Sequence, residues 1–361
     1  MLSKIHLTNI KCFEQLELSL GNLTLLSGIN SMGKSTVIQA LLLLRNSYEK
    51  GLLNKGIFLN NDYTQIGVGK ELLNSGAATD DPFQIGIEDK NKFTWNISYE
   101  SDADFLKVQQ SGEGALRKVN LFGSGFEFLS AERLGPRSSY RKSYFHVHEK
   151  ESMGVHGEYA VHFLSDNENL KLSNTSVLHP GEEINMLRLQ VEKWLSEISP
   201  GLKISFEDYD RANLLGLQIR QTGGDIIQSY SPLNVGFGIS YILPIIVTLL
   251  KAEEGDLVIL ENPEAHLHPK GQRKMGELIS KAANGGVQII LETHSDHILN
   301  GIRLSARNKE IDPEKVQLYY FSKDQDMKPV VENPIIQPDG RLNFWPDGFF
   351  DEWDKAIDEM F

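Results

Sequence analysis

The sequence predicts an α/β fold, and three observations support this class. Apolar segments at 23–26, 257–260 and 287–291 have the length of buried strands, and each ends at polar or acidic residues. An apolar run at 37–44 follows the first strand after a short turn and reads as a helix. The chain has 361 residues, of which 40% are hydrophobic and 24% charged, as in a soluble globular protein of one large or two ordinary domains.

The turn between the first strand and this helix carries a phosphate-binding pattern. Residues 28–36 read GINSMGKST and match GxxxxGK[ST] in strand, turn and helix order. Backbone N–H groups of such a turn bind phosphates, its lysine reaches the β- and γ-phosphates, and its hydroxyl holds Mg²⁺. The pattern predicts ATP binding by Asn30, Ser31, Gly33, Lys34, Ser35 and Thr36, with Ser35 also a metal ligand. The alternative is a chance match in a turn that contains glycine.

Two later strands end in groups suited to nucleotide chemistry. Residues 257–260 are apolar and lead to Glu261, and the ends of parallel strands are where ligands bind, so Glu261 is expected to hold Mg²⁺ directly or through water. Residues 287–291 lead to the sequence ETHS, in which His294 is a candidate sensor of the γ-phosphate. Taken alone, a histidine at a strand end is more often an ordinary one.

Composition limits the class of protein. The net charge of −13 does not favour tight nonspecific nucleic-acid binding, although a local basic groove stays open. Cys12 is the single cysteine, so no intrachain disulfide can form, and the N-terminal residues lack the apolar core of a signal peptide. The apolar run at 241–250 is too short to span a membrane. We therefore expect a cytoplasmic protein that does not interact with a membrane.

The elements between the two ends of the chain are less regular. Two opening strands are expected near 5–10 and 16–20, and several strand-like segments between 83 and 128 suggest a β-rich insertion. Residues 183–198 have apolar side chains at helical spacing and end before Pro200 and Gly201. Two more strands are expected at 202–206 and 214–220.

These motifs together carry a family resemblance. The opening IHLTNIKCFEQLELSL, then GINSMGKST, the apolar-acidic strand and THSD resemble the ATPase head of the ABC superfamily, within its SMC-like branch that includes the overcoming-lysogenisation-defect ATPases. The resemblance implies a signature segment, which 234–240 (NVGFGIS) resembles. Gly238 and Ser240 would then open a helix onto the γ-phosphate held by a partner subunit, although a turn before a core helix is the alternative.

A narrower resemblance covers nearly the whole chain. The segments SAERLGPR (130–137), ENPEAHLHPKGQ (261–272), ETHSDHILNGIR (292–303) and the closing RLNFWPDGFFDEWDKAIDEMF are similar to a bacterial family of AAA-like ATPases with a short C-terminal domain of unknown function. Some relatives of this type act in defence against phage or mobile DNA with a nuclease or another effector. The resemblance therefore implies a homodimer closed by ATP and a separate effector protein.

One departure from the family pattern concerns catalysis. ABC ATPases usually end the acidic strand in Asp and then Glu, where the second carboxylate activates water, but this chain has Glu261 and Asn262. Asn262 cannot accept a proton, although it can orient a water molecule, so hydrolysis is expected to be slow. Glu264 is a candidate to supply the carboxylate instead, with a structural contact in the loop as the alternative.

Other polar residues have a functional and a structural interpretation. Gln65 occupies roughly the place of the glutamine that senses Mg²⁺ in such ATPases, and Lys11 aligns with a basic residue near the phosphates; ordinary loop positions are the alternative for both. Arg133 and Arg137 could contact phosphate, DNA or a partner subunit, or pair internally with Glu132 or Glu158.

Two further groups invite a metal or nuclease interpretation. His266 and His268 with His294 and Glu264 form a poor transition-metal set. Asp324 and Asp326 resemble a nuclease pair but fit an acidic loop better.

The resulting prediction is a P-loop ABC-type ATPase head with a β-rich and helical insertion and a small C-terminal cap. We expect an N-terminal lobe at 1–75, the insertion at 76–225, a C-terminal lobe at 226–310 and the cap at 311–361. Its function is ATP binding and hydrolysis with Mg²⁺, dimerisation on nucleotide and control of an effector. Alternatives are a non-hydrolysing ATP-bound scaffold or an ATPase that clamps DNA. The aromatic, acidic tail at 344–361 either packs on the head or docks a partner.

Overall fold

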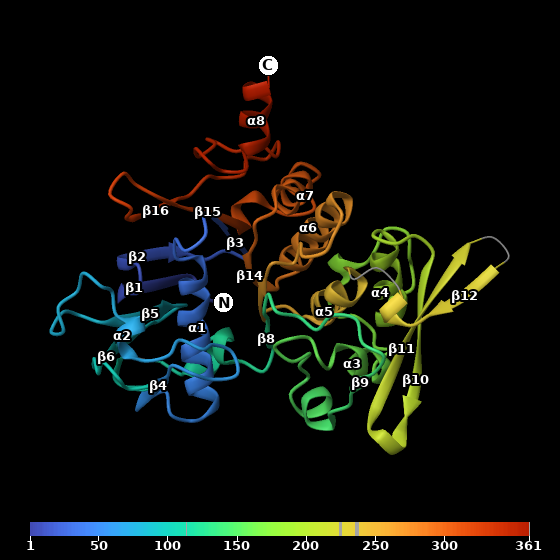
Figure 1. Ribbon diagram of the computed structural model, residues 1–361, viewed down its shortest axis with the longest axis horizontal. Helices are drawn as coiled ribbons and strands as arrows, with labels where there is room; N and C mark the ends of the chain where they lie inside the picture. The colour runs from blue at the N-terminus through green and yellow to red at the C-terminus, as the bar shows by residue number, and fades with distance from the viewer. Residues whose placement is uncertain (113, 224–225, 235–237, 361) are drawn as a thin grey trace.

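The computed structural model describes residues 1–112, 114–223, 226–234 and 238–360. Within these ranges the core is a six-stranded sheet in the order β16-β15-β3-β14-β13-β8, in which β15 to β8 run parallel and β16 is antiparallel at one edge. The bounds are β3 Leu23–Gly28, β8 Phe126–Leu129, β13 Leu257–Glu261, β14 Gln288–Glu292, β15 Val316–Lys323 and β16 Pro329–Glu332. The predicted α/β class is confirmed, and Figure 1 shows this sheet beside the long helices.

Helices bury both faces of the parallel sheet. The helices are α1 Lys34–Glu49, α5 Gly238–Lys251, α6 Pro269–Asn284 and α7 Asp296–Arg307. In β13, Leu257 and Ile259 join the hydrophobic cluster that contains α1, whereas Val258 and Leu260 join the cluster that contains α5 and α6. A strand buried on both faces needs a continuous apolar run, which explains why these strands carry no polar alternation.

A second six-stranded sheet, which is antiparallel, packs against α1 in the N-terminal part of the chain. Its order is β2-β1-β5-β6-β7-β4. The bounds are β1 Lys4–Ile10, β2 Phe13–Ser19, β4 Gly56–Phe58, β5 Gln84–Glu88, β6 Lys92–Ile97 and β7 Phe105–Ser111, with the short helix α2 at Gly69–Leu72. The two opening strands are confirmed. The leucines of α1 pack between this sheet and the parallel sheet, so the central turn of the helix, residues 40–44, is apolar on all sides.

The strands at 84–111, expected within an insertion that begins at 76, belong to the N-terminal sheet instead. Ile5 pairs with Ile87 and Leu7 with Ile85, so β5 to β7 continue the sheet started by β1 and β2. β8 likewise pairs with β13 in the parallel sheet. The difference arises because strand partners far apart in sequence are chosen by packing, which the local pattern does not reveal.

The segment between β8 and α5 contains a third sheet and two helices that share the core of the parallel sheet. Its strands are β9 Tyr140–Arg141, β10 Leu202–Tyr209, β11 Leu214–Gly223 and β12 Ile226–Tyr230, and its helices are α3 Ala160–Asp166 and α4 Leu187–Ser196. The expected helix and both expected strands of this region are confirmed. In Figure 1 the β10–β11 hairpin extends away from the parallel sheet. Short helical turns occur at Leu116–Lys118, Asn120–Phe122, Phe145–Glu149, Thr175–Val177, Asp210–Ala212, Pro232–Asn234 and Pro313–Lys315.

The C-terminal segment belongs in part to the central sheet and in part projects from it. Strand β15, expected in a cap, pairs with β3 in parallel and so extends the central sheet. Beyond β16, Phe349 is 1% exposed and packs against Tyr320, while Phe344 and Trp345 are more than 40% exposed. The last helix, α8 (Glu352–Met360), projects from the body in Figure 1. Across the described ranges, none of the helices has the length and apolarity needed to cross a bilayer.

Candidate nucleotide-binding site

The phosphate loop connects β3 to α1 and depends on two glycines. Gly28 has a φ of 134°, and a Cβ there would lie 2.1 Å from the Phe321 carbonyl oxygen. Gly33 has a φ of 101°, and its Cβ would lie 2.2 Å from the ring of Phe13. Helix α1 begins at Lys34 with no side-chain cap and no acidic residue in its first turn. Its N-terminal N–H groups and positive dipole end are therefore suited to an anion.

Lys34 is held inside the loop. The side chain is 3% exposed, and its Nζ donates to the carbonyl oxygens of Gly28 and Ile29, at 2.9 Å each. Burial lowers the pKa of Lys34, and the charge of Glu292 opposes this shift. The lysine thus donates to two neutral acceptors, and charged phosphate oxygens would form stronger hydrogen bonds in their place.

The predicted loop residues surround one hollow of about 280 Å³. It is lined by Lys11, Cys12, Asn30, Ser31, Gly33, Lys34, Ser35, Thr36, Gln39 and Glu292. Lys11, predicted from the family resemblance, lies at this hollow with a φ of 51°, and its Nζ donates to Gln39 Oε1 at 2.7 Å. Burial lowers the pKa of Lys11. The structure therefore brings the loop and this lysine together.

Glu292 is the residue that the sequence interpretation missed. Its Oε2 and Oε1 accept from the Ser35 hydroxyl at 3.1 and 3.2 Å. Burial, followed by the charge of Glu261, raises the pKa of Glu292 to about 7, while Lys34 and Ser35 oppose the shift. The available signal was its place as the last residue of a buried strand, directly opposite Glu261 in the sheet.

Glu261 lies at the same edge but has a different environment. Its Oε2 accepts from the Ala131 N–H at 3.0 Å. Burial raises the pKa of Glu261, and the Ala131 N–H and the charge of Arg133 lower it. Glu261 and Gln65 line a hollow of about 670 Å³, and Gln65 Nε2 donates to the Asn61 carbonyl at 2.8 Å. Gln65, predicted to sense Mg²⁺, therefore lies at the same hollow as Glu261.

Arg133 holds the backbone around the end of β13. It is 4% exposed and donates to the carbonyl oxygens of Ser130 at 2.7 Å, Glu261 at 2.6 Å, Asn262 at 2.6 Å and Tyr241 at 3.1 Å. Burial lowers its pKa to about 10. This arrangement corrects the expected contact with phosphate, DNA or a partner, and also the expected pair with Glu132 or Glu158. Arg137 is exposed.

The loop after β13 is tied to the end of β14. Asn262 has a φ of 45°, and its N–H donates to the Glu292 carbonyl at 2.9 Å. Glu264 accepts from the Thr293 hydroxyl and from the His294 N–H, both at 2.7 Å. Both oxygens of Glu264 thus accept hydrogen bonds from the neighbouring loop, which is the structural contact given above as the alternative to a catalytic role.

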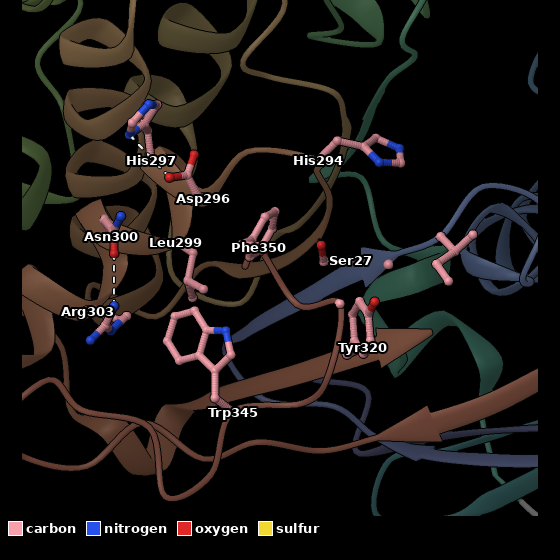
Figure 2. Close-up of a pocket in the computed structure, with 13 residues that line it drawn as sticks. Ser27, His294, Asp296, His297, Leu299, Asn300, Arg303, Tyr320, Trp345 and Phe350 are labelled. Carbon is pink, nitrogen blue, oxygen red and sulfur yellow. Dashed lines mark hydrogen bonds and ion pairs between the residues drawn. The ribbon is translucent and has the colours of Figure 1, made fainter. Parts of the chain in front are cut away.

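His294 follows β14 and lines a second cavity together with Gly28 and Ile29 at the start of the phosphate loop. Partial burial and the nearby charge of Lys34 lower the pKa of His294. The cavity, of about 930 Å³, is shown in Figure 2 between the start of the phosphate loop, α7 and the C-terminal segment. Trp345 lies beside Leu299 there, and the His294 ring points away from both of them.

The signature-like segment is placed in part. Residues 235–237 lie outside the described residues, and α5 begins at Gly238. A Cβ on Gly238 would lie 2.7 Å from the His266 carbonyl oxygen. Ser240 is 6% exposed, and its side chain lies near that of Tyr140. The helix starts where it was predicted, but Ser240 is buried in this conformation.

The histidines of the imagined transition-metal set and the two aspartates have ordinary structural contacts. No group of three or more His, Cys, Asp or Glu side chains there could hold a metal ion. His268 caps α6 by accepting from the Lys270 N–H at 3.3 Å, and the His266 ring packs on Tyr241. Asp324 accepts from the backbone of the turn between β15 and β16, with Asp326 in the same turn.

Comparisons with known proteins place the chain among ATPase-type domains. Residues 23–300 match the family model described as "AAA domain, putative AbiEii toxin, Type IV TA system", and residues 311–360 match DUF3696, a protein of unknown function. The OLD nuclease of Thermus scotoductus is 25% identical over 367 residues, covering 92% of this chain and 67% of that protein.

Among solved structures, this chain is similar to two SMC heads. One is bound to the C-winged helix domain of ScpA, with a TM-score of 0.56, 13% identity and coverage of 92% of this chain and 98% of that one. The other, from Pyrococcus furiosus, has an extended coiled coil and is bound to the C-terminal domain of ScpA, with a TM-score of 0.51, 12% identity and 99% of each chain covered. These likenesses show the SMC-head fold.

Proposed function

The chain belongs to the AAA-domain family that its residues 23–300 match, and from this premise we propose that it binds and hydrolyses ATP as an ABC/SMC-type head. The observation that carries the proposal is the contact of the phosphate loop with Glu292, beside a second carboxylate at the end of the neighbouring strand. Lys34 and Ser35 start α1, and Glu292 and Glu261 end the neighbouring strands β14 and β13. Cation, hydroxyl and carboxylates thus converge at the carboxyl edge of a parallel sheet.

The residues of this chain can be given roles in that reaction. Lys34 would exchange the Gly28 and Ile29 carbonyls for oxygens of the β- and γ-phosphates. Ser35 and the nearby carboxylates supply the hard oxygen ligands that suit Mg²⁺. When bound, Mg²⁺ would supply positive charge that offsets the negative charge of the phosphates. His294 supplies an imidazole beside the loop, suited to a hydrogen bond with the γ-phosphate.

We further propose that ATP closes a homodimer. The resemblance of 234–240 to the family signature supports this proposal, since Gly238 and Ser240 start a helix that can approach a partner's γ-phosphate. Because Ser240 is buried, closure would require the start of α5 to turn Ser240 outward. Binding energy for the γ-phosphate would shift the population from open to closed dimers, and the closed dimer would control a separate effector in defence against phage or mobile DNA.

A non-hydrolysing switch is the second candidate, and one observation favours it. Asn262 carries no base where the family usually has a carboxylate, and both oxygens of Glu264 are engaged by Thr293 and His294. ATP would then hold the dimer closed without rapid turnover. Direct DNA clamping has less support, because the net charge is −13.

Steady-state ATP turnover and solution mass, measured with and without ATP, test the proposal. The unmodified chain is compared with Lys34→Ala, Glu261→Gln and the exposed-lysine control Lys203→Ala. Turnover that is lost in the first two variants and kept in the control supports an ATPase. Dimerisation by ATP without turnover supports the switch, and no ATP binding by the unmodified chain refutes both.

A further inference from the structure

We propose that Glu292, rather than Glu261, is the carboxylate ligand of the divalent cation that accompanies the nucleotide, together with Ser35. This inference rests on the proposed function, because it assigns a residue within the same site. The usual assignment places that cation between the phosphate-loop hydroxyl and the acidic residue after the strand that β13 represents. In this chain a second carboxylate lies nearer to the hydroxyl.

The strand order explains why Glu292 is the nearer group. β14 lies between β3 and β13, so its last residue is opposite Leu26 of the strand that enters the phosphate loop. Ser35, in the first turn of α1, contacts both oxygens of Glu292 at 3.1 and 3.2 Å. Glu261 is one strand further from the loop.

The two carboxylates also face different hollows. Glu292 lines the phosphate-loop hollow with Lys34 and Ser35. Glu261 lines the hollow that contains Gln65, and its Oε2 accepts from Ala131. A cation beside the loop hydroxyl would therefore meet the Glu292 oxygens first.

Charge points in the same direction. Glu292 is 7% exposed and lies beside Glu261, whose charge acts on it unfavourably. Two neighbouring carboxylates away from water are costly unless a cation or hydrogen-bond donors compensate them. Lys34 supplies part of that compensation, but ATP would draw its ammonium toward the phosphates. A divalent cation at Ser35 and Glu292 would replace the lost positive charge.

The test measures how strongly the metal improves nucleotide binding, independently of turnover. The probe is a non-hydrolysable ATP analogue, titrated calorimetrically into the full chain with Mn²⁺ and separately with EDTA. Glu292→Gln and Glu261→Gln form a matched pair, because they are strand-end glutamates in register. We expect the ratio of the two affinities to fall at least about tenfold in Glu292→Gln, and to change little in Glu261→Gln.

The outcomes separate this inference from the proposed function. If the unmodified chain binds the analogue in neither condition, the proposed function fails. If it binds in both and Glu292→Gln keeps the full metal effect, or Glu261→Gln loses more of it, the ligand assignment alone is overturned.

A second variant distinguishes a ligand from a residue that supports the fold. Glu292→Cys would place a soft thiolate at the metal, which favours Cd²⁺ over Mg²⁺. We expect this variant to regain metal-dependent analogue binding with Cd²⁺ and not with Mg²⁺, while Glu261→Cys does not. Because Cys12 lines the same hollow, the unmodified chain is titrated with Cd²⁺ as the background. Absence of Cd²⁺ rescue in a folded Glu292→Cys variant contradicts the assignment.

Discussion

The hydroxyl of Ser35 lies 3.1 Å from Oε2 of Glu292, so the phosphate loop and the end of β14 meet through one hydrogen-bonded pair. This contact joins the first helix of the chain to a strand that begins more than 250 residues later. It depends on the parallel pairing of β14 with β3, which aligns the carboxyl ends of both strands. The site is therefore a property of the sheet order as well as of the loop sequence.

Replacement of Gly33 by alanine should disrupt the loop more than the same change at a control glycine. At Gly33 a Cβ meets both a φ of 101° and the Phe13 ring, whereas Gly51 has a φ of 68° and open space around it. Gly51→Ala should cost about 1–2 kcal/mol for the left-handed backbone, and Gly33→Ala more than that. Urea unfolding measures both, and analogue binding should be lost in Gly33→Ala alone. Equal losses of stability would show that the Phe13 contact is unimportant.

The stability of the metal-free protein should depend on pH through Glu292. Its pKa is raised from 4.5 to about 7 in the folded chain, so its stabilising contribution is complete below about pH 4.5 and lost as pH rises through about 7. Glutamine does not ionise, so Glu292→Gln abolishes this pH-dependent loss of stability. The variant should therefore gain stability relative to the unmodified chain between pH 4.5 and 7, by at most about 3 kcal/mol.

Urea unfolding in EDTA at pH 5 and pH 8 measures this difference. The exposed Glu132→Gln serves as the control and should show no such change. A difference between Glu292→Gln and the unmodified chain that is the same at both pH values would contradict the prediction.

Local elements of this fold could be predicted from the sequence, whereas several long-range contacts could not. The strand, loop and helix from Leu23 to Glu49 follow from apolar runs and a spaced glycine pattern, and so does the strand before Glu261. The pairing of β5 with β1 and the contact of Ser35 with Glu292 depend on which distant strands lie side by side. Local propensity carries little information on that choice.

Arg133 shows the same limit at the level of one side chain. Its Gly-Pro neighbours and planar cation suggest phosphate binding, but burial and four backbone acceptors make it a structural residue. Arg133→Met would leave these carbonyls without their donor in a buried environment, at a cost of about 3–5 kcal/mol. Arg137→Met, at an exposed position, should change stability by less than about 0.5 kcal/mol. If urea unfolding gives equal values, Arg133 does not support the end of β13.

Phe349 should anchor the C-terminal segment to the head. It is 1% exposed and packs on Tyr320 of β15 and on Trp345. Phe349→Ala removes a buried aromatic ring, which typically costs about 3–5 kcal/mol, whereas Phe344→Ala acts on a ring that is 42% exposed and should cost far less.

The two phenylalanine variants also separate anchoring from general stability. Residues beyond β16 contribute Trp345 and Phe350 to the 930 Å³ cavity and do not form part of the parallel sheet. Loss of the anchor should therefore let this segment open locally, and limited proteolysis should cleave it before the parallel sheet unfolds. Cleavage near residues 340–350 should therefore be faster in Phe349→Ala than in Phe344→Ala, while the fragment that contains the phosphate loop stays intact. Equal cleavage of the two variants would mean that the segment is held by other contacts, such as the bond from Arg303 Nε to the Gly340 carbonyl at 2.8 Å.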